Sequence, residues 1–437
     1  MKKMGSIGYG LTSLLVLLAL TLSVVSCAGN NLQPALPQAN LAADAQQYDL
    51  IFAVAGDSRS AVSYINPDDK GSPPFAGYIN TMVQDEMRNY LINYGKGLPG
   101  FFFMHLGDFA MRGGTEIFQT YMLEMASLQN AGIPVYATIG NHELRYYEPK
   151  ETHDAESDAN TLKAQQQYQA TIGKSKMIPS DAQFPQDYEG GLAYYFRRET
   201  PGGSSVFIVL DAFYVNHDNP KEPNYKKGYY SDFQLKWLQD TLIYYQTHGN
   251  VKNIFVFSHQ PAYDANAGDG RFYTNYNSPD SNRANWILWA LLDKYQVDAY
   301  FCGHSHFYHR WFIRGGTPSD AGGKPFEYLW DKTGDAKWRS LGSDFNTSNL
   351  SNIKDNKLTW QTVIPQIVNG SCGAGLQGFG GNSVPADKRE NAYNFSIVKV
   401  KGDTITVEVY SFNVHTQAKL IDKFQKQSDQ WQNLPTN

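Results

Sequence analysis

The feature that most constrains this chain is the motif Gly140-Asn141-His142-Glu143, which directly follows an apolar run. That run, residues 133–138, has the length and β-branched content of a buried strand. A glycine after it ends the strand and lets the backbone turn sharply. Asn141 and His142 are therefore expected at the carboxyl end of a strand, where open α/β sheets bind their ligands. An amide oxygen beside an imidazole suits a metal ion together with a proton donor.

The same arrangement recurs along the chain. Apolar runs at 49–55, 101–106, 253–257 and 298–302 each read as a strand, and each is followed by an acid or an imidazole. Any one of these could be an ordinary turn residue or a structural histidine. Their repetition at strand ends favours a shared site. The residues concerned are Asp57, Asp108, Asn141 with His142, His259, and His304 with His306.

Helical segments separate these strands, as expected of a βαβ sheet with right-handed crossovers. Helices are predicted over 78–94, over 116–129 with Thr115 as N-cap, and over 283–295. Ser231 and Gln234 form a capping-box pattern that opens a helix to about residue 246. The C-terminal part is predicted as strands over 362–368, 393–400 and 404–412, the last two joined by a hairpin turn at Gly402-Asp403.

Composition limits the function classes. The net charge is −5 and there is no block of Lys or Arg, which argues against a nucleic-acid polymer as the partner. The chain holds 29 Tyr and 24 Phe. So many aromatic side chains either pack a large core, which is the favoured interpretation, or wall a pocket for an organic or oligosaccharide-like ligand.

The N-terminus is typical of an exported protein. Lys2 and Lys3 precede a short apolar run that ends at Val24-Val25-Ser26-Cys27, which resembles a bacterial lipobox. We expect a signal peptide over 1–26, lipid on Cys27 as the membrane anchor, and a place in the bacterial cell envelope, periplasmic or on the outer surface. Loss of the two lysines would leave a mature charge of about −7. An ordinary signal or an uncleaved anchor is the alternative.

A flexible tether is expected over 27–48 and the main domain over 49–416, with insertions near 144–191 and 315–360 and a tail over 417–437. The 144–191 insertion is expected to lie over the site and to hold a short helix near 162–168. Cys302 and Cys372 remain after Cys27. An oxidising compartment permits a disulfide between them, but each lies beside an apolar run, where a free thiol also fits.

A ring of carboxylate, amide and imidazole groups has a clear chemical use. Two metal ions about 3.5–4 Å apart share a carboxylate, hold a phosphoryl oxygen and lower the pKa of a bound water. An imidazole that binds neither ion can then protonate the leaving oxygen.

In order and context, these motifs resemble the five blocks of the calcineurin-like metallophosphoesterases, in particular the purple-acid-phosphatase-like branch. The blocks are Gly56-Asp57, Gly107-Asp108, Gly140-Asn141-His142-Glu143, Ser258-His259-Gln260-Pro261 and Gly303-His304-Ser305-His306.

The resemblance implies an α/β fold, a four-layer α/β/β/α sandwich, that holds two divalent or trivalent ions (Fe, Zn, Mn or Mg). A first site would comprise Asp57, Asp108 and His306, and a second site Asp108, Asn141, His259 and His304, with Asp108 bridging. His142 would act on the phosphate as leaving-group acid, with Glu143 as its supporting partner.

Two positions depart from the family pattern. Arg59 stands where many members have a histidine ligand, and Met111 stands where purple acid phosphatases have a tyrosine. A guanidinium has no lone pair for a metal but suits a phosphate. Arg59 is therefore expected to bind substrate, or to leave the first site weak so that one ion binds instead of two; a surface ion pair is the plainer alternative. Met111 predicts that the protein is not purple.

The leading hypothesis is hydrolysis of a small phosphate monoester by a metal-held hydroxide. Asp108 and His142 are its catalytic residues, and Arg59, Asn141 and His142 bind the substrate. A phosphodiesterase acting on nucleotides or lipid headgroups is the closest alternative. A non-catalytic binding lipoprotein on a degenerate fold is a second, and a glycosidase, which would leave the histidines without a role, is a third.

Overall fold

The protein is described by a computed structural model. The chain divides into 1–39, which lies outside the described residues, and 40–437. The described residues are 47–59, 76–145, 158–185, 190–213, 228, 230–262, 288–289, 291–314, 353–354, 357–358, 363–379, 386–413 and 416–436. The expected signal peptide, Cys27 and most of the 315–360 insertion therefore fall outside them.

The first large sheet combines parallel and antiparallel strands. Its order is β16-β15-β14-β13-β1-β2-β3, with β1, β2 and β3 parallel to one another and the others antiparallel to their neighbours. The strands are β1 (Leu50–Ala55), β2 (Phe102–His105), β3 (Val135–Ala137), β13 (Tyr393–Lys401), β14 (Thr404–Phe412), β15 (Lys419–Gln427) and β16 (Gln430–Asn433).

The second large sheet has the order β12-β8-β11-β7-β6-β5-β4, with β5, β6, β7 and β11 parallel. Its strands are β4 (Tyr194–Thr200), β5 (Gly203–Leu210), β6 (Val251–Ser258), β7 (Ala299–Cys302), β8 (Tyr308–Arg314), β11 (Val363–Asn369) and β12 (Lys388–Glu390). A separate pair joins β9 (Ile353–Lys354) to β10 (Lys357–Leu358).

The two large sheets face each other across an aromatic core. The ring of Phe52 on β1 lies 5.2 Å from that of Phe207 on β5 and 5.1 Å from that of Phe255 on β6, both edge-on. Edge-on packing of this kind stabilises a core beyond the apolar area that it buries. Alternate residues of the strands turn toward this core, as the two-residue period of a strand requires. The high aromatic content is thus used, in good part, for packing between sheets.

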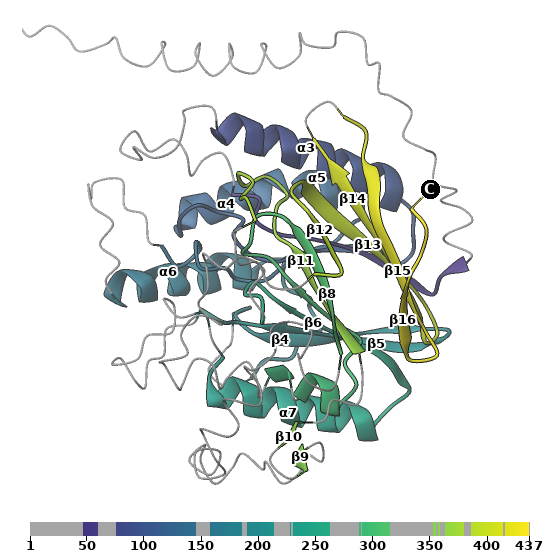
Figure 1. Cartoon of the computed structure of the whole chain (residues 1–437). Helices are drawn as coiled ribbons and strands as arrows, with labels where there is room; N and C mark the ends of the chain where they lie inside the picture. Colours follow the sequence, from purple (N-terminus) through teal and green to yellow (C-terminus); the bar gives the residue numbers. More distant parts are fainter. Residues whose placement is uncertain are drawn as a thin grey trace, which may run out of the picture. The chain divides into compact units, whose positions relative to one another are not determined.

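Helices cover the outer faces of the sheets (Figure 1). On α3 (Ala76–Gly95), the ring of Tyr90 lies 4.9 Å from Phe395 of β13. On α7 (Asp232–Thr247), Tyr245 packs 5.5 Å from Tyr195 of β4. The layers follow the expected order of helix, sheet, sheet, helix. The remaining helices are α4 (Thr115–Glu124), α5 (Ala126–Asn130), α6 (Asp158–Thr171) and the 3₁₀ turn η2 (Ile172–Lys174).

Several local predictions need correction. The helix expected over 116–129 is two helices that meet at Met125, and Thr115 is the first helical residue, preceded by Gly114 at the N-cap without a side-chain cap. The helix expected near 162–168 extends over the whole of α6. Residues after 416 form β15 and β16 instead of a tail, and β4 and β8 were not expected.

The Ser231 cap is confirmed, since the Ser231 hydroxyl accepts a hydrogen bond from the backbone N–H of Gln234 at 3.0 Å. The Gln234 side chain does not complete a capping box. Instead its Oε1 accepts from Asp211 N at 2.9 Å and its Nε2 donates to Asp211 O at 2.7 Å. The start of α7 is thereby fastened to the residue that follows β5.

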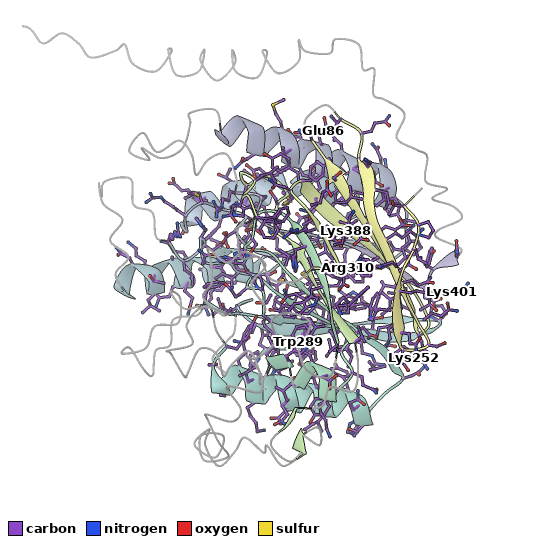
Figure 2. All side chains as sticks on the ribbon, viewed as in Figure 1. Glu86, Lys252, Trp289, Arg310, Lys388 and Lys401 are labelled. Carbon is purple, nitrogen blue, oxygen red and sulfur yellow. The ribbon has the colours of Figure 1, made fainter. Side chains whose placement is uncertain are left out.

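A buried ion pair joins the two sheets. Arg310 of β8, labelled in Figure 2, is 1% exposed, and its Nε donates to Asp422 Oδ2 of β15 at 2.7 Å. Tyr308 donates its hydroxyl to the same oxygen at 2.7 Å. Phe312 and Phe424 flank the guanidinium, with centroids 4.2 and 4.5 Å away. Asp422 is therefore the counterion that lets the core hold an arginine.

Among the described residues, no helix combines the length and apolarity needed to cross a membrane.

Candidate metal centre

The predicted ligands lie together, at the carboxyl ends of parallel strands drawn from both large sheets. Because β1 to β3 and β5 to β7 each run in one direction, their ends meet at one edge, where the following loops turn inward. Asp57 follows β1, Asp108 follows β2, Asn141 and His142 follow β3, His259 follows β6, and His304 and His306 follow β7.

Glycines make this crowding possible. A Cβ on Gly140 would lie 2.3 Å from Asp108 Oδ1, and one on Gly303 would lie 2.4 Å from Asp57 Oδ2. The aspartates themselves adopt the left-handed backbone region, with φ of 58° at Asp57 and 52° at Asp108. Non-glycine residues rarely adopt this conformation, and such strain collects at functional sites.

The ligand atoms of the second site point at one another. Asn141 Oδ1 lies 3.2 Å from His259 Nε2 and 3.1 Å from His304 Nδ1, and the two imidazole nitrogens are 3.3 Å apart. Asp108 Oδ1 is 3.3 Å from the same His259 nitrogen. Atoms that can all offer lone pairs gain little from each other and much from a shared cation, so this donor set fits a metal ion.

The orientation of His259 supports the same conclusion. Its Nδ1 donates to the backbone carbonyl of Leu106 at 2.8 Å, which turns Nε2 toward the cluster. A metal-binding histidine usually has its other nitrogen fixed in this way. Asp57, Asp108 and His259 also each have one ligand atom within 4.8 Å of the others.

The first site has fewer protein ligands but the same character. Asp57 Oδ1 and His306 Nε2 face each other at 3.5 Å, both buried, and neither has a hydrogen-bond partner among the described residues. Their other polar atoms are occupied: Asp57 Oδ2 accepts from His304 N at 2.9 Å and His306 Nδ1 bonds to Gly375 O at 2.8 Å. Buried polar atoms without partners are costly, and a cation between them would remove that cost. With Asp108 they would make an open site of three protein ligands.

The charges of the site depend strongly on one another. Burial acts against ionisation of Asp108, but the neighbouring His259, His142 and Arg59 prevail, and the pKa of Asp108 lies well below its ordinary value. Burial likewise opposes the charge on His259, yet Asp108 and Asp57 raise its pKa to about 9. Without metal, the cluster thus takes up a proton where a cation would fit.

Arg59 reaches the same point from the β1 loop. Its Nη2 lies 2.9 Å from His142 Nε2 and 3.5 Å from Asp108 Oδ2. His142 Nδ1 faces the carbonyl of Met111 at 2.9 Å, so Nδ1 donates there and Nε2 accepts from Arg59. Burial, together with the charge of Arg59, lowers the pKa of His142 well below its ordinary value. His142 is therefore neutral in this arrangement.

The sequence suggested that Glu143 supports His142, but its carboxylate instead binds backbone groups. Its carboxylate accepts three backbone N–H groups: Asp108 and Gly140 at 2.9 and 2.7 Å on Oε2, and Ala110 at 2.9 Å on Oε1. Burial and the nearby Asp108 raise the pKa of Glu143 to about 8. The side chain ties the loop after β2 to the loop after β3, which together supply Asp108, Asn141 and His142.

The cysteine question that the sequence left open is settled for Cys302 and Cys372. Both are buried free thiols. Cys372 Sγ lies 3.8 Å from His105 Nε2, which is also 3.1 Å from Ser58 Oγ. These residues pack behind the β1 loop.

The sequence did not reveal the residues that fix the Arg59 loop. Asn80 and Gln84 of α3 donate side-chain N–H groups to the carbonyls of Arg59 and Ser58, at 3.0 and 3.2 Å. One signal was present: Asn80 and Gln84 are four apart, on the buried face of α3 that also carries Met87 and Leu91. Gly375 and Gln377, which hold His306 by hydrogen bonds, had no signal of this kind.

Two facing mixed sheets with candidate metal ligands at the strand ends are consistent with the metallophosphoesterase fold. Residues 84–308, just over half of the chain, match the family model described as calcineurin-like phosphoesterase. The chain belongs to this family.

Similar individual proteins are distant. The uncharacterized proteins Rv2577 and MT2654 of Mycobacterium tuberculosis are each 33% identical over 146 residues, which cover 33% of this chain. The match spans 24% of the length of these curated relatives.

Similar solved structures include the purple acid phosphatase PPD1 from seeds of yellow lupin (Lupinus luteus). The two sequences are 14% identical, the match covers 86% of this chain and 53% of PPD1, and the TM-score is 0.48. A dimetal phosphatase from Danio rerio is similar at 15% identity, 86% and 99% coverage and a TM-score of 0.42.

Proposed function

We propose that this chain is a metal-dependent hydrolase of small phosphate monoesters. The observation that carries the proposal is the gathering of Asn141 Oδ1, His259 Nε2 and His304 Nδ1 within 3.1–3.3 Å of one another, beside His142 and Arg59. The family is one of phosphoesterases. Two oxygen-binding cations with an imidazole and a guanidinium beside them suit phosphoryl transfer, which depends mainly on positioning and charge neutralisation.

The ions would be held by Asp108, Asn141, His259 and His304 at the second site, and by Asp57, His306 and the shared Asp108 at the first. When bound, such ions polarise phosphoryl oxygens and make a water acidic enough to act as nucleophile near neutral pH. Fe, Zn, Mn and Mg all fit this mixture of oxygen and imidazole ligands. The second site, with more protein ligands, is expected to bind its ion more tightly.

The chain's own groups have distinct tasks in this proposal. Asn141 and Arg59 orient the phosphate, and Asp108 stays ionised because its pKa is held low. His142 Nε2 hydrogen-bonds the phosphate or the leaving oxygen and delivers a proton to that oxygen as its bond to phosphorus breaks. His142 is neutral while its Nε2 accepts from Arg59, so it takes up that proton from water once a phosphate oxygen replaces Nε2 as the acceptor of the Arg59 N–H.

The test combines elemental analysis with hydrolysis of paired substrates. Purified protein loaded with Mn²⁺, Zn²⁺ or Fe is given p-nitrophenyl phosphate and bis(p-nitrophenyl) phosphate, beside the variants Asp108→Asn and Arg198→Gln. Arg198 is a matched control, since it binds Asp181 and Tyr136 away from the site. We expect monoester turnover in the wild type and in Arg198→Gln, and none in Asp108→Asn.

Other outcomes separate the alternatives. Faster turnover of the diester would identify a phosphodiesterase. Metal binding without turnover of either ester, under any metal, would favour a binding protein on this fold.

The place of the protein in the cell is a separate part of the proposal. It rests on the lipobox-like residues Val24-Val25-Ser26-Cys27, which lie outside the described residues. We propose a lipid on Cys27 that anchors the enzyme in a bacterial cell envelope. Labelled fatty acid should enter the wild-type chain and not Cys27→Ser, and equal labelling would overturn this part alone.

A further inference from the structure

Arg59 is held in place by its backbone, before any substrate is present. Its φ of 46° is left-handed, and its N–H donates to the carbonyl of Asp108 at 3.0 Å. Its own carbonyl accepts from Asn80 Nδ2 at 3.0 Å, and the preceding carbonyl, of Ser58, accepts from Gln84 Nε2 at 3.2 Å. The β2 loop and helix α3 thus fix a conformation that an arginine would not adopt unaided.

The side chain is equally directed. It is only 16% exposed, its Nη2 lies between His142 Nε2 and Asp108 Oδ2, and its Nε is buried with no hydrogen-bond partner among the described residues. Among the described residues, its nearest polar contact is the His142 imidazole at 2.9 Å, and the Asp108 carboxylate is 0.6 Å further away at 3.5 Å. A residue kept for an ion pair would instead grip a carboxylate with two N–H groups. The guanidinium thus keeps a buried N–H donor that no acceptor among the described residues satisfies.

We propose that Arg59 is a specificity-determining residue that selects the dianion of a phosphate monoester over the monoanion of a diester, and that Asn80 and Gln84 are positioning residues for it. This rests on the proposed function, since it concerns the phosphate bound at the same site. At neutral pH a monoester phosphate has three terminal oxygens and a charge of about −1.5 to −2. A diester has two terminal oxygens and one charge.

The preference follows from the number of charges and oxygens. A fixed guanidinium attracts the more highly charged group more strongly, and its planar fork needs free oxygens to accept two parallel N–H bonds. Because Asn80 and Gln84 hold the loop already, little ordering is left to be done when phosphate binds. A monoester has a third terminal oxygen and an additional charge, whereas in a diester that third oxygen carries an ester group.

The central experiment compares wild type with Arg59→Asn and Arg59→Lys. Asparagine tolerates the left-handed backbone, and lysine keeps the charge but loses the fork. For p-nitrophenyl phosphate we expect kcat/KM to fall by about 10- to 100-fold in Arg59→Asn, the scale of one hydrogen bond to a charged group. For bis(p-nitrophenyl) phosphate it should fall by clearly less, with Arg59→Lys intermediate for the monoester. Metal content should be unchanged in both variants.

Binding measurements separate this inference from the proposed function. Calorimetry on the Mn²⁺-loaded protein with inorganic phosphate and with dimethyl phosphate needs no turnover. We expect the wild type to favour inorganic phosphate and Arg59→Asn to lose most of that preference. Equal losses for both anions, or none, would overturn the selectivity of Arg59 even if the enzyme hydrolyses monoesters. If Arg59→Asn loses the preference for inorganic phosphate but the wild type hydrolyses neither ester, the selectivity of Arg59 is supported and the proposed function is overturned.

The positioning role has its own matched pair of variants. Asn80→Leu and Gln84→Leu remove donors to the Arg59 loop, whereas Gln246→Leu removes the same kind of contact, from Gln246 Nε2 of α7 to Tyr295 O at 2.9 Å, away from the site. The α3 variants should raise KM for the monoester and weaken phosphate binding several-fold while kcat changes little. If Gln246→Leu has the same effect, or if the α3 variants change only thermal stability, Asn80 and Gln84 are structural and not positioning residues.

Discussion

The Nη2 atom of Arg59 lies 2.9 Å from the Nε2 atom of His142, although the two residues are 83 positions apart in the sequence. Since Met111 O accepts a hydrogen bond from His142 Nδ1–H, the imidazole nitrogen that faces the site is an acceptor that Arg59 satisfies. A phosphate oxygen entering between them would accept from Arg59 and release His142 Nε2. Both side chains would then bind the same phosphate group.

If His142 protonates the leaving oxygen, its removal should matter most when that oxygen is a poor leaving group. We expect His142→Gln to lower kcat for an alkyl phosphate by about 100- to 10,000-fold, and much less for p-nitrophenyl phosphate. Metal content should stay that of the wild type. His248→Gln is the control, because His248 stacks on Tyr244 at the end of α7. An equal loss of kcat with both esters would contradict the role of His142 as leaving-group acid.

Metal binding should depend on pH through His259. Its pKa is raised to about 9 without metal, so at lower pH the imidazole carries a proton that must leave before Nε2 can bind an ion. The apparent affinity should therefore rise with pH between 6 and 8, by up to about tenfold per pH unit. Calorimetry in two buffers of different ionisation enthalpy should show about one proton released per ion bound at the second site. Binding without proton release would contradict this.

Glu143 should set metal affinity as well as stability. Glu143→Ala leaves the buried N–H groups of Asp108, Ala110 and Gly140 without their acceptor, at about 1–3 kcal/mol for each group. We expect lower free energy of unfolding and weaker metal binding, partly restored in Glu143→Gln, which retains one carbonyl oxygen. Asp298→Ala is the comparison, since Asp298 comes just before β7, at the end of that strand opposite the loop with His304 and His306, and accepts from Ile254 N at 2.7 Å and from Lys426 Nζ at 2.6 Å. It should lose stability but bind metal normally; weaker binding there too would make the Glu143 effect non-specific.

Loss of one partner of the Arg310–Asp422 ion pair should lower the free energy of unfolding more than replacement of both partners. Asp422→Asn leaves a buried guanidinium without its counterion, and we expect the free energy of unfolding to fall by about 3–5 kcal/mol. Arg310→Met with Asp422→Leu should recover much of that loss, because apolar side chains fit between Phe312 and Phe424. Denaturant unfolding of the wild type, Asp422→Asn and the double variant checks both statements, and a double variant no more stable than Asp422→Asn would contradict them.

The same ion pair explains which parts of the fold the sequence did not reveal. The strands that lead to the candidate ligands are short apolar runs. They could be predicted because a run of apolar residues by itself indicates a buried strand. β8 and β15 carry Arg310 and Asp422 toward the core, and a charged residue at a buried position obscures the strand pattern until its partner 112 residues away is known. The candidate ligands could be named for the same local reason, since each directly follows such a run, and the structure brings them together. The fixed geometry of Arg59 was not, since it depends on Asn80 and Gln84 of another element.

The pairing of β1 has a consequence for the order of events during synthesis. β1, which leads into Asp57, lies between β2 and β13, with Leu50 opposite Val400. Most of the chain must therefore be synthesised before β1, which precedes Asp57, can pair with both of its neighbours. Contacts between residues so far apart in the sequence form slowly. His304 and His306 are also translated late. We expect the nascent chain to be unable to hold its ions, so that loading follows release of the finished polypeptide.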